Sequence, residues 1–468
     1  MYNVILNLNK ITVVGFFGLS VLYSANLKAQ SLEAAVATAL DTHPDIRQAF
    51  ARFKAKEEDV NRASAGYLPT IDLTAGYGYE YTDTPGNRRN AINGDDGETE
   101  LARGEFGVSI KQILFDGMFT SNEIDRTKFE ASAEQWTLIA NAEDLALQVA
   151  KAYLNFIKTA EFVKLSEKNI ASHQAIYLQI KERTDSGLGN IADLSQVTGR
   201  LARAQSNMIS ARNNNLDARS QFIRLTNAQP NSLVLPVPDA DMLPKDKVLG
   251  LNLAIKNHPV IRSAQQDISA ARSFKSSINA RYYPTLSLEL AANSDNDIAG
   301  ESGINRFGPD VGGHRNDATA MLRFRYNFYA GGKDVASERS AAYKVSEAQE
   351  INYSAHRQVT ESFGLAWNAF KMLALQKKYL KQHVTTSSDT KSAYKQQFDI
   401  GQRNLLDLLD TENELFQARK DYLDADFNEL SAQYRLLNAT GQLLDSLRVT
   451  RSTKWKGEHE YEQGAYNE

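Results

Sequence analysis

The segment HPDIR at residues 43–47 recurs as HPVIR at residues 258–262, 215 positions later. YLPT at residues 67–70 recurs as YYPT at residues 282–285 with the same offset. Further along, an offset of 214 pairs Gly117 with Gly331, Tyr153 with Trp367, Phe156 with Phe370, Gly187 with Gly401, Asn190 with Asn404 and Asp193 with Asp407. An offset held across most of the chain indicates one duplicated unit, not two unrelated domains.

Composition narrows the classes of protein to which this chain can belong. It has 468 residues, a net charge of −4 and no cysteine. So small a charge does not imply a polyanionic partner, and we expect no nucleic-acid binding. The lack of cysteine excludes disulfides, thiolate metal sites and a lipid-anchored N-terminus. No catalytic triad, phosphate loop or metal-ligand spacing appears in the sequence, so we expect neither an enzyme nor a cofactor.

The first residues are typical of a secretory signal peptide. Lys10 precedes an apolar run at residues 11–22, and small and polar residues follow up to Ala29. We expect cleavage after Ala29. The apolar run is too short to span a bilayer, and no later window is apolar over about twenty residues. Any part of the mature chain that spans a membrane must therefore be made of strands.

The repeat and the proline pattern predict the domain organisation. Pro230, Pro236, Pro238 and Pro244 mark an extended linker between the halves. The expected parts are a signal peptide at 1–29, a first structural repeat at 30–229, a Pro-rich linker at 230–247, a second repeat at 248–445 and a polar C-terminal tail at 446–468. Because the helical pattern stops near Ser446, we expect the tail to be loose.

Four segments alternate between apolar and polar residues with a period of two: 71–81, 106–111, 286–290 and 320–328. The first and the last are about as long as the roughly ten residues of a tilted membrane strand, and the other two are shorter. A soluble antiparallel sheet shows the same alternation. The signal peptide and the aromatic residues on single strand faces favour a membrane barrel. Those aromatic residues are Tyr77, Tyr79, Tyr81, Phe324, Tyr326 and Phe328.

Polar loops at residues 83–103 and 294–317 join these strands in pairs and resemble the external loops of outer-membrane barrels. Four strands cannot close a barrel. Two copies would give eight strands with a filled interior, whereas three would give twelve and room for a lumen. A pore therefore requires at least a trimer.

Two proline-free stretches predict long helices, at residues 117–186 and in the second repeat after Gly331. Apolar residues recur at intervals of three and four, as in a coiled coil. Each helix could extend about 100 Å at 1.5 Å per residue. Shorter returning helices at about 191–228 and 404–440 complete two hairpins. A solvated coiled coil shows the same seam, but each hairpin here directly follows a pair of strands.

The chain resembles the TolC family of outer-membrane channel-tunnels over nearly its whole mature length. The resemblance rests on the duplicated element order, the HP and YxPT motifs, LFDG at 114–117 and GQRNLLDLLD at 401–410. It implies an α+β membrane protein, a homotrimer with a 12-stranded β-barrel that continues into a long α-helical periplasmic tunnel. The location implied is the outer membrane of a Gram-negative cell, in contact with outer-membrane lipid.

The family resemblance also implies a passive export duct in an envelope-spanning tripartite system. Its partners would be a periplasmic membrane-fusion adaptor protein and an inner-membrane transporter. KQILFDG at 111–117 with Ser121, Asn122 and Glu123 looks most like the type I secretion branch, whose transporter is of the ABC type. The alternatives are a multidrug or small-molecule efflux channel and, from another class, a periplasmic coiled-coil adaptor without a barrel.

In the family, carboxylates at the places of Asp407 and Asp410 form rings at the periplasmic entrance, a constriction that favours cations. The first repeat has Asp193 and Gln196 there, so the doublet is specific to the second hairpin. A solvated helix face is the alternative. Arg403 and Asp193 match residues that latch neighbouring hairpins, although Arg403 could instead face water. Phe398 stands where the best-known relatives have a tyrosine, so the closed state must lack that hydroxyl.

Charged residues within the strands complete the candidate sites. We expect Glu80, Lys111, Glu289, Arg323 and Arg325 to line the barrel lumen. His43 and His258 recur and could suggest metal ligands. Each precedes a proline at a helix start, which favours a helix N-cap over a metal site.

Overall fold

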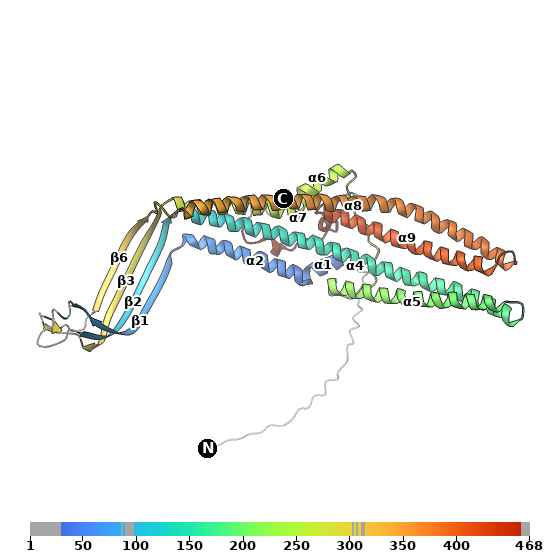
Figure 1. Ribbon diagram of the computed structural model, residues 1–468, viewed down its shortest axis with the longest axis horizontal. Coiled ribbons are helices and arrows are strands. Elements are labelled where there is room, and N and C mark those ends of the chain that lie inside the picture. The colour runs from blue at the N-terminus through green and yellow to red at the C-terminus, as the bar shows by residue number, and fades with distance from the viewer. Residues whose placement is uncertain are drawn as a thin grey trace, which may run out of the picture.

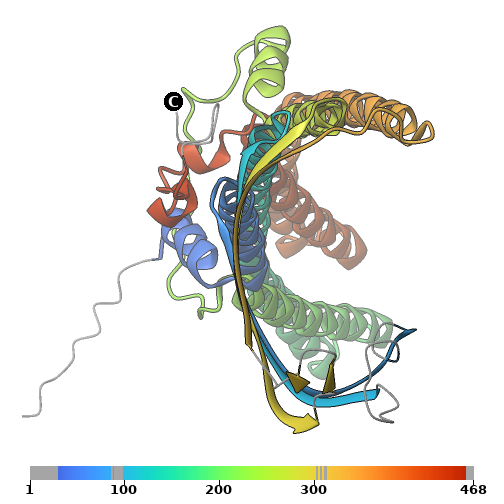
Figure 2. The same cartoon turned by 90° about the vertical axis from the view of Figure 1, so that its left-hand side faces the viewer.

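The structure is a computed structural model that describes residues 30–85, 88, 98–301, 304–305, 308–309 and 314–459. The expected signal peptide lies outside these residues. The chain is a long rod with a sheet at one end (Figure 1). At the other end are the turns of two helical hairpins, one between α4 (Phe119–Asp185) and α5 (Ile191–Thr226) and one between α8 (Lys333–Asp399) and α9 (Leu405–Ala439). Viewed along the rod, the helices form a curved wall and the sheet follows the same curve (Figure 2).

The same order of elements occurs twice, which confirms the predicted duplication. The first set is α1 (Leu32–Thr42), α2 (Pro44–Ser64), β1 (Thr70–Asp83), β2 (Glu98–Phe115), α4 (Phe119–Asp185) and α5 (Ile191–Thr226). The second set is α6 (Lys247–Asn257), α7 (Pro259–Asn279), β3 (Thr285–Glu301), β6 (His314–Arg325), α8 (Lys333–Asp399) and α9 (Leu405–Ala439). Short elements accompany them: 3-10 turns at Ala65–Tyr67, Ala280–Tyr282 and Thr453–Lys456, strands β4 (Ile304–Asn305) and β5 (Gly308–Pro309), and α10 (Leu443–Ser446).

Both repeated histidines are helix caps, as predicted. His43 Nδ1 accepts the N–H of Asp45 at 3.3 Å, and His258 Nδ1 accepts the N–H of Val260 at 3.3 Å. The prolines that follow occupy the first turn of α2 and α7. Burial lowers the pKa of His258 to about 4, so its ring stays neutral and Nδ1 stays an acceptor.

The four long strands form one antiparallel sheet in the order β1-β2-β3-β6. They exceed the predicted lengths, and the predicted loops are correspondingly shorter. β2 already begins at Glu98 and β3 continues to Glu301, because backbone pairing persists through residues whose polar side chains suggested loop. Tyr326 and Phe328 lie beyond the end of β6, with their ring centroids 4.6 Å apart.

Glycine makes the turn from strand to long helix possible. Gly117, between β2 and α4, has φ +68°, and a Cβ there would lie 2.6 Å from the carbonyl oxygen of Ala280. Only glycine fits both the conformation and the space.

Among the described helices, none has an apolar stretch long enough to cross a bilayer.

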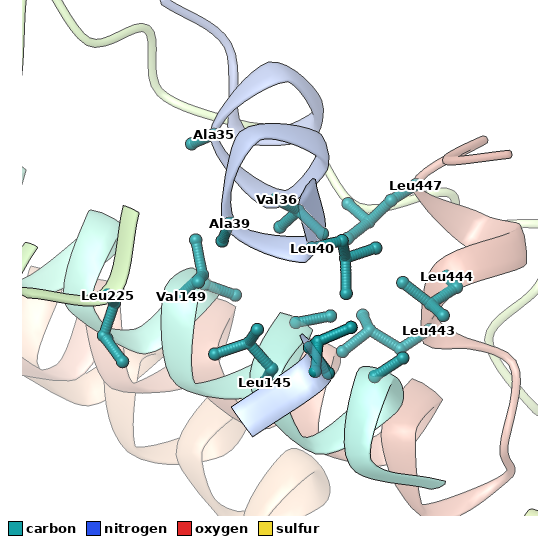
Figure 3. Packing of buried hydrophobic residues seen from close by; sticks show 14 of the residues in the cluster. Ala35, Val36, Ala39, Leu40, Leu145, Val149, Leu225, Leu443, Leu444 and Leu447 are labelled. Carbon is teal, nitrogen blue, oxygen red and sulfur yellow. The ribbon is translucent and has the colours of Figure 1, made fainter. Parts of the chain in front are cut away.

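The main apolar core lies at the middle of the rod, where α1, α4, α5 and α10 meet (Figure 3). Val149 and Leu145 on α4 pack in the same cluster as Leu40 on α1 and Leu443 on α10. The hydroxyl of Tyr153 lies 2.6 Å from the Val234 carbonyl oxygen, to which it donates a hydrogen bond. This bond ties the linker to α4.

The expectation of a loose C-terminal tail is wrong for residues 447–459. Trp455 is buried in the same core, and Gln135 Nε2 on α4 donates to its carbonyl oxygen at 2.8 Å. Glu57 Oε1 on α2 accepts the N–H of Glu458 at 2.6 Å. The buried tryptophan and these side-chain to backbone contacts thus hold a polar segment that has no helical periodicity.

Candidate functional site

The two faces of the sheet differ in chemistry. Residues directly opposite each other share a face, so the register places Glu80, Lys111, Glu289, Arg323 and Arg325 on one face. Large apolar side chains, many aromatic, occupy the other face and are exposed in the single chain: Ile71, Leu73, Tyr77, Tyr79, Tyr81, Phe106, Leu288, Leu290, Leu322 and Phe324. The sheet is thus amphipathic across its whole width.

Ion pairs connect neighbouring strands on the charged face. Arg323 Nε lies 2.7 Å from Glu289 Oε2, and Lys111 Nζ lies 3.8 Å from Glu289 Oε1. Both cations therefore share the Glu289 carboxylate, which joins three strands.

Arg103 is a charged residue of this face that sequence reasoning missed. Its guanidinium lies 2.8 Å from Glu80, 3.0 Å from Glu105 and 3.5 Å from Asp295. The residue fell within the predicted loop 83–103. Its spacing of two residues from Glu105 and eight from Lys111 is the signal that could have found it, because residues on one strand face recur at even intervals.

At the opposite end of the rod, two asparagines begin the returning helices. Asn190 Oδ1 accepts the N–H of Ala192 at 2.9 Å, and Asn404 Oδ1 accepts the N–H of Asp407 at 2.8 Å. Asn is among the preferred N-cap residues because its side chain satisfies a free N–H of the first turn. These caps fix where α5 and α9 start, and hence where the residues of the first turns lie.

Asp407 and Asp410 lie in the first turns of α9, as expected, and each contacts a different arginine. Arg403 Nη1 lies 3.3 Å from Asp407 Oδ2 within the same hairpin. Arg200 Nη2, on α5 of the other hairpin, lies 2.8 Å from Asp410 Oδ1. Sequence reasoning did not single out Arg200, because nothing along the chain relates it to a residue 210 positions away.

Arg403 is held within its own hairpin. Its Nε donates to Gln397 Oε1 at 3.0 Å, and its guanidinium carbon lies 4.1 Å from the centroid of the Tyr394 ring. Asp193 lies in the first turn of α5. In the part of the single chain that is described, no ion pair joins Arg403 to Asp193. The expected latch between neighbouring hairpins stays a prediction.

An apolar cluster connects the two hairpins near their turns. Phe398 on α8 is buried with Ile176 and Ile180 of α4, Val197 of α5 and Leu408 of α9. The Arg183 guanidinium carbon lies 5.2 Å from the centroid of the Phe398 ring. Within one chain, the place expected to lack a tyrosine hydroxyl is therefore filled by apolar packing and a cation–π contact.

A second ion pair lies near this apolar cluster. Lys391 Nζ on α8 is 2.7 Å from Glu412 Oε1 on α9. His173 on α4 is buried, and its Nδ1 has no hydrogen-bond partner. Burial lowers the pKa of His173; Glu412 opposes the shift, and Arg200 and Lys391 add to it. The ring is therefore neutral near pH 7.

The described residues hold no group of three His, Cys, Asp or Glu side chains that could bind a metal. The sheet and the two hairpin turns lie at opposite ends of one rod (Figure 1), and both carry the charged side chains described above. That arrangement suits conduction along the rod.

Comparisons with known proteins agree with this interpretation. The family model described as outer membrane efflux protein matches residues 35–228 and 250–442. The chain is 22% identical to the outer membrane efflux protein BepC of Brucella suis over 92% of this chain and 90% of that protein. It is 24% identical to the outer membrane protein TolC of Escherichia coli K12 over 90% of this chain and 84% of TolC.

A solved structure supports the fold. A membrane protein from Pseudomonas aeruginosa superposes with a TM-score of 0.76 at 17% identity, over 90% of this chain and 92% of that one. The α+β fold predicted from the sequence, with its duplicated unit of helices and strands, is therefore confirmed for the single chain. Because the family model matches both repeats, the chain belongs to the outer membrane efflux protein family, that of TolC, and is an outer-membrane channel with a periplasmic helical part, not an enzyme.

Proposed function

We propose that three copies of this chain form a homotrimer that exports proteins in a type I secretion system. Twelve strands would close a barrel in the outer membrane, and the helices would form a tunnel across the periplasm. A periplasmic membrane-fusion adaptor and an inner-membrane transporter of the ABC type would deliver the cargo. Glu80, Lys111, Glu289, Arg323 and Arg325 would then face the water-filled lumen.

The amphipathic sheet is the observation that most strongly supports the proposed homotrimer. Lipid requires an apolar outer face and offers no partner to backbone groups, so the outer edges of β1 and β6 need a second copy. Three sheets of four strands give a barrel with a lumen. Both edges of the helical wall also expose apolar residues seven positions apart, Ile209 and Leu216 on α5 and Met372 and Tyr379 on α8. Such spacing is typical of a coiled-coil seam.

The assembly is tested by extraction of the protein from outer membranes with detergent and measurement of its mass by native mass spectrometry. We expect three copies in a detergent-requiring particle. A monomer that stays dissolved without detergent would contradict the barrel and favour the periplasmic adaptor.

The gate is tested by conductance in planar bilayers. In the proposed trimer, Asp407 and Asp410 ring the periplasmic entrance and Arg403 helps to hold it closed. We expect Asp407→Ala with Asp410→Ala to reduce the preference for cations, and Arg403→Ser to raise single-channel conductance. Unchanged selectivity in the double variant would remove the acidic ring from the proposal.

The cargo is tested by deletion of the gene. For type I secretion, we expect at least one protein to disappear from the culture medium and to return on complementation. Efflux of small molecules is the second candidate, since relatives such as BepC are named efflux proteins. Increased sensitivity to dyes and detergents with an unchanged set of secreted proteins would favour efflux.

A further inference from the structure

Asp410 is paired with a cation that belongs to the other hairpin. Arg200 lies on α5 and Asp410 on α9, with 2.8 Å between Nη2 and Oδ1. The neighbouring pairs differ, because Arg403 with Asp407 and Lys391 with Glu412 both stay within the second hairpin. A movement of one hairpin relative to the other would therefore separate Arg200 from Asp410 and leave the other two pairs intact.

This pairing changes the charge of the expected acidic ring. In each copy, the carboxylates of Asp407 and Asp410 are matched by the guanidinium groups of Arg403 and Arg200, so the four side chains sum to zero. Opposite charges about 3 Å apart produce little potential at a distance. While the hairpins are in contact, the ring attracts cations only weakly.

The surroundings of Arg200 favour Asp410 as its partner. The nearby carboxylate of Glu412 is already 2.7 Å from Lys391. His173, also close to Arg200, is buried and neutral, so it adds no competing charge. The side chain of Arg200 is 26% exposed and that of Asp410 is 57% exposed. The carboxylate thus faces solvent, and the guanidinium lies largely covered behind it.

We propose that Arg200 sets the ion selectivity of the periplasmic entrance: it neutralises Asp410 while the two hairpins touch, and exposes a cation-attracting carboxylate when they part. This inference rests on the proposed function, since it requires Asp410 to face the bore. Selectivity for small inorganic cations then depends on the position of the hairpins. One carboxylate per copy is switched, whereas Asp407 stays compensated by Arg403.

The test is the reversal potential of the full-length protein in planar bilayers under a KCl gradient. We expect Arg200→Gln to raise the cation-to-anion permeability ratio by about two- to tenfold, because an uncompensated charge is focused in a narrow bore. Arg203→Gln is the matched control: it removes the same charge from α5 three positions further on, and Arg203 is exposed. Arg200→Lys keeps the charge and should stay close to the wild type.

The decisive comparison uses Asp410→Asn as the background. We expect Arg200→Gln to lose its gain over the wild type there: the double variant should return close to the wild-type ratio, because it removes both charges of the pair. A double variant that stays as cation-selective as Arg200→Gln alone, or equal effects of Arg200→Gln and Arg203→Gln, would overturn the role of Arg200. If Arg200→Gln fails to fold, Asp410→Asn alone decides: we expect cation preference to fall, and no change overturns the inference.

Failure of the proposed function gives a different result. If the wild type forms no channels in the bilayer, the conduit is refuted and the inference falls with it. If the wild type conducts and only the Arg200 comparison fails, the conduit stands and the inference alone is lost.

Discussion

The helices α4 and α8 have the same length, 67 residues, and the same place in the repeat, yet their surroundings differ. α4 contacts α2, α5, α7 and α9, and buries side chains from Thr120 to Ile180. α8 lies at the edge of the wall. After Ala366, its only buried residues are Ser387 and Phe398.

This difference shows that duplication copies an element without copying its environment. On α8, Leu365, Met372 and Tyr379 are exposed at intervals of seven and therefore lie on one side of the helix. On α4, the interior of the same chain provides the partners. In the proposed trimer, a second copy would provide them for α8, and three predictions test this contrast.

The largest expected effect concerns the exposed side of α8. We expect Met372→Asp with Tyr379→Asp to abolish the trimer, since an unpaired charge in a buried contact costs roughly 3 to 5 kcal/mol and each trimer would contain six. The measurement is the mass of the detergent-solubilised particle, which should fall from three copies to one.

A matched pair of substitutions makes this result specific. Ala374→Asp with Lys381→Asp also places two aspartates seven residues apart on exposed positions of α8, but on another side of the helix. This control should remain trimeric. If the Met372 and Tyr379 variant stays trimeric as well, α8 is not the edge that a second copy covers.

A smaller effect is expected where α8 does contact α4. Phe398→Ala should weaken the contact between the two hairpin turns by about 3 kcal/mol, because it leaves a cavity beside Ile176 and Ile180. We expect higher open probability in bilayers and faster hydrogen exchange in the turns. Leu188→Ala, in the exposed turn of the first hairpin, is the control and should change neither. An unaltered gate in Phe398→Ala would mean that apolar packing does not hold the closed state.

Much of the fold could be predicted from the sequence because its signals are local. The His43 and His258 caps, the helix starts at Asn190 and Asn404, and the positions of Asp407 and Asp410 all depend on residues within one or two turns. The register of the strands likewise follows from alternation, which is why the five expected lumen residues share one face.

The remaining features depend on contacts between residues distant in sequence. Arg200 forms its ion pair with Asp410, 210 positions away, and Trp455 is buried in a core built around α4. Arg103 lay in a stretch whose polar composition suggested a loop, yet cross-strand pairing extends the strand through it. Neither composition nor periodicity records which distant residue a side chain will meet.

The last contrast between the two long helices concerns a buried charge. Glu143 on α4 is buried, and the equivalent position 214 residues later on α8 is the exposed Arg357. The Glu143 carboxylate accepts the N–H groups of Leu443 at 3.0 Å and Leu444 at 3.2 Å, at the start of α10. Burial raises the pKa of Glu143 to about 8, although these two bonds oppose the shift.

The raised pKa gives stability a defined dependence on pH. The folded chain keeps a proton on Glu143 that the unfolded chain loses near pH 4.3. The stability that this bound proton provides is complete below about pH 4 and is lost as pH rises through 8. Over that window, the free energy of unfolding should fall by up to about 1.4 kcal/mol per pH unit. Glu143→Gln keeps an acceptor for α10 and cannot titrate, so its stability should vary less between pH 5.5 and about 8. Melting temperatures across this range measure the difference.

Glu361→Gln, exposed on α8, is the control and should follow the wild type. If the melting temperature of Glu143→Gln also varies with pH as that of the wild type does, the carboxylate is already ionised in the folded state. Its two hydrogen bonds to α10 then outweigh the cost of burial.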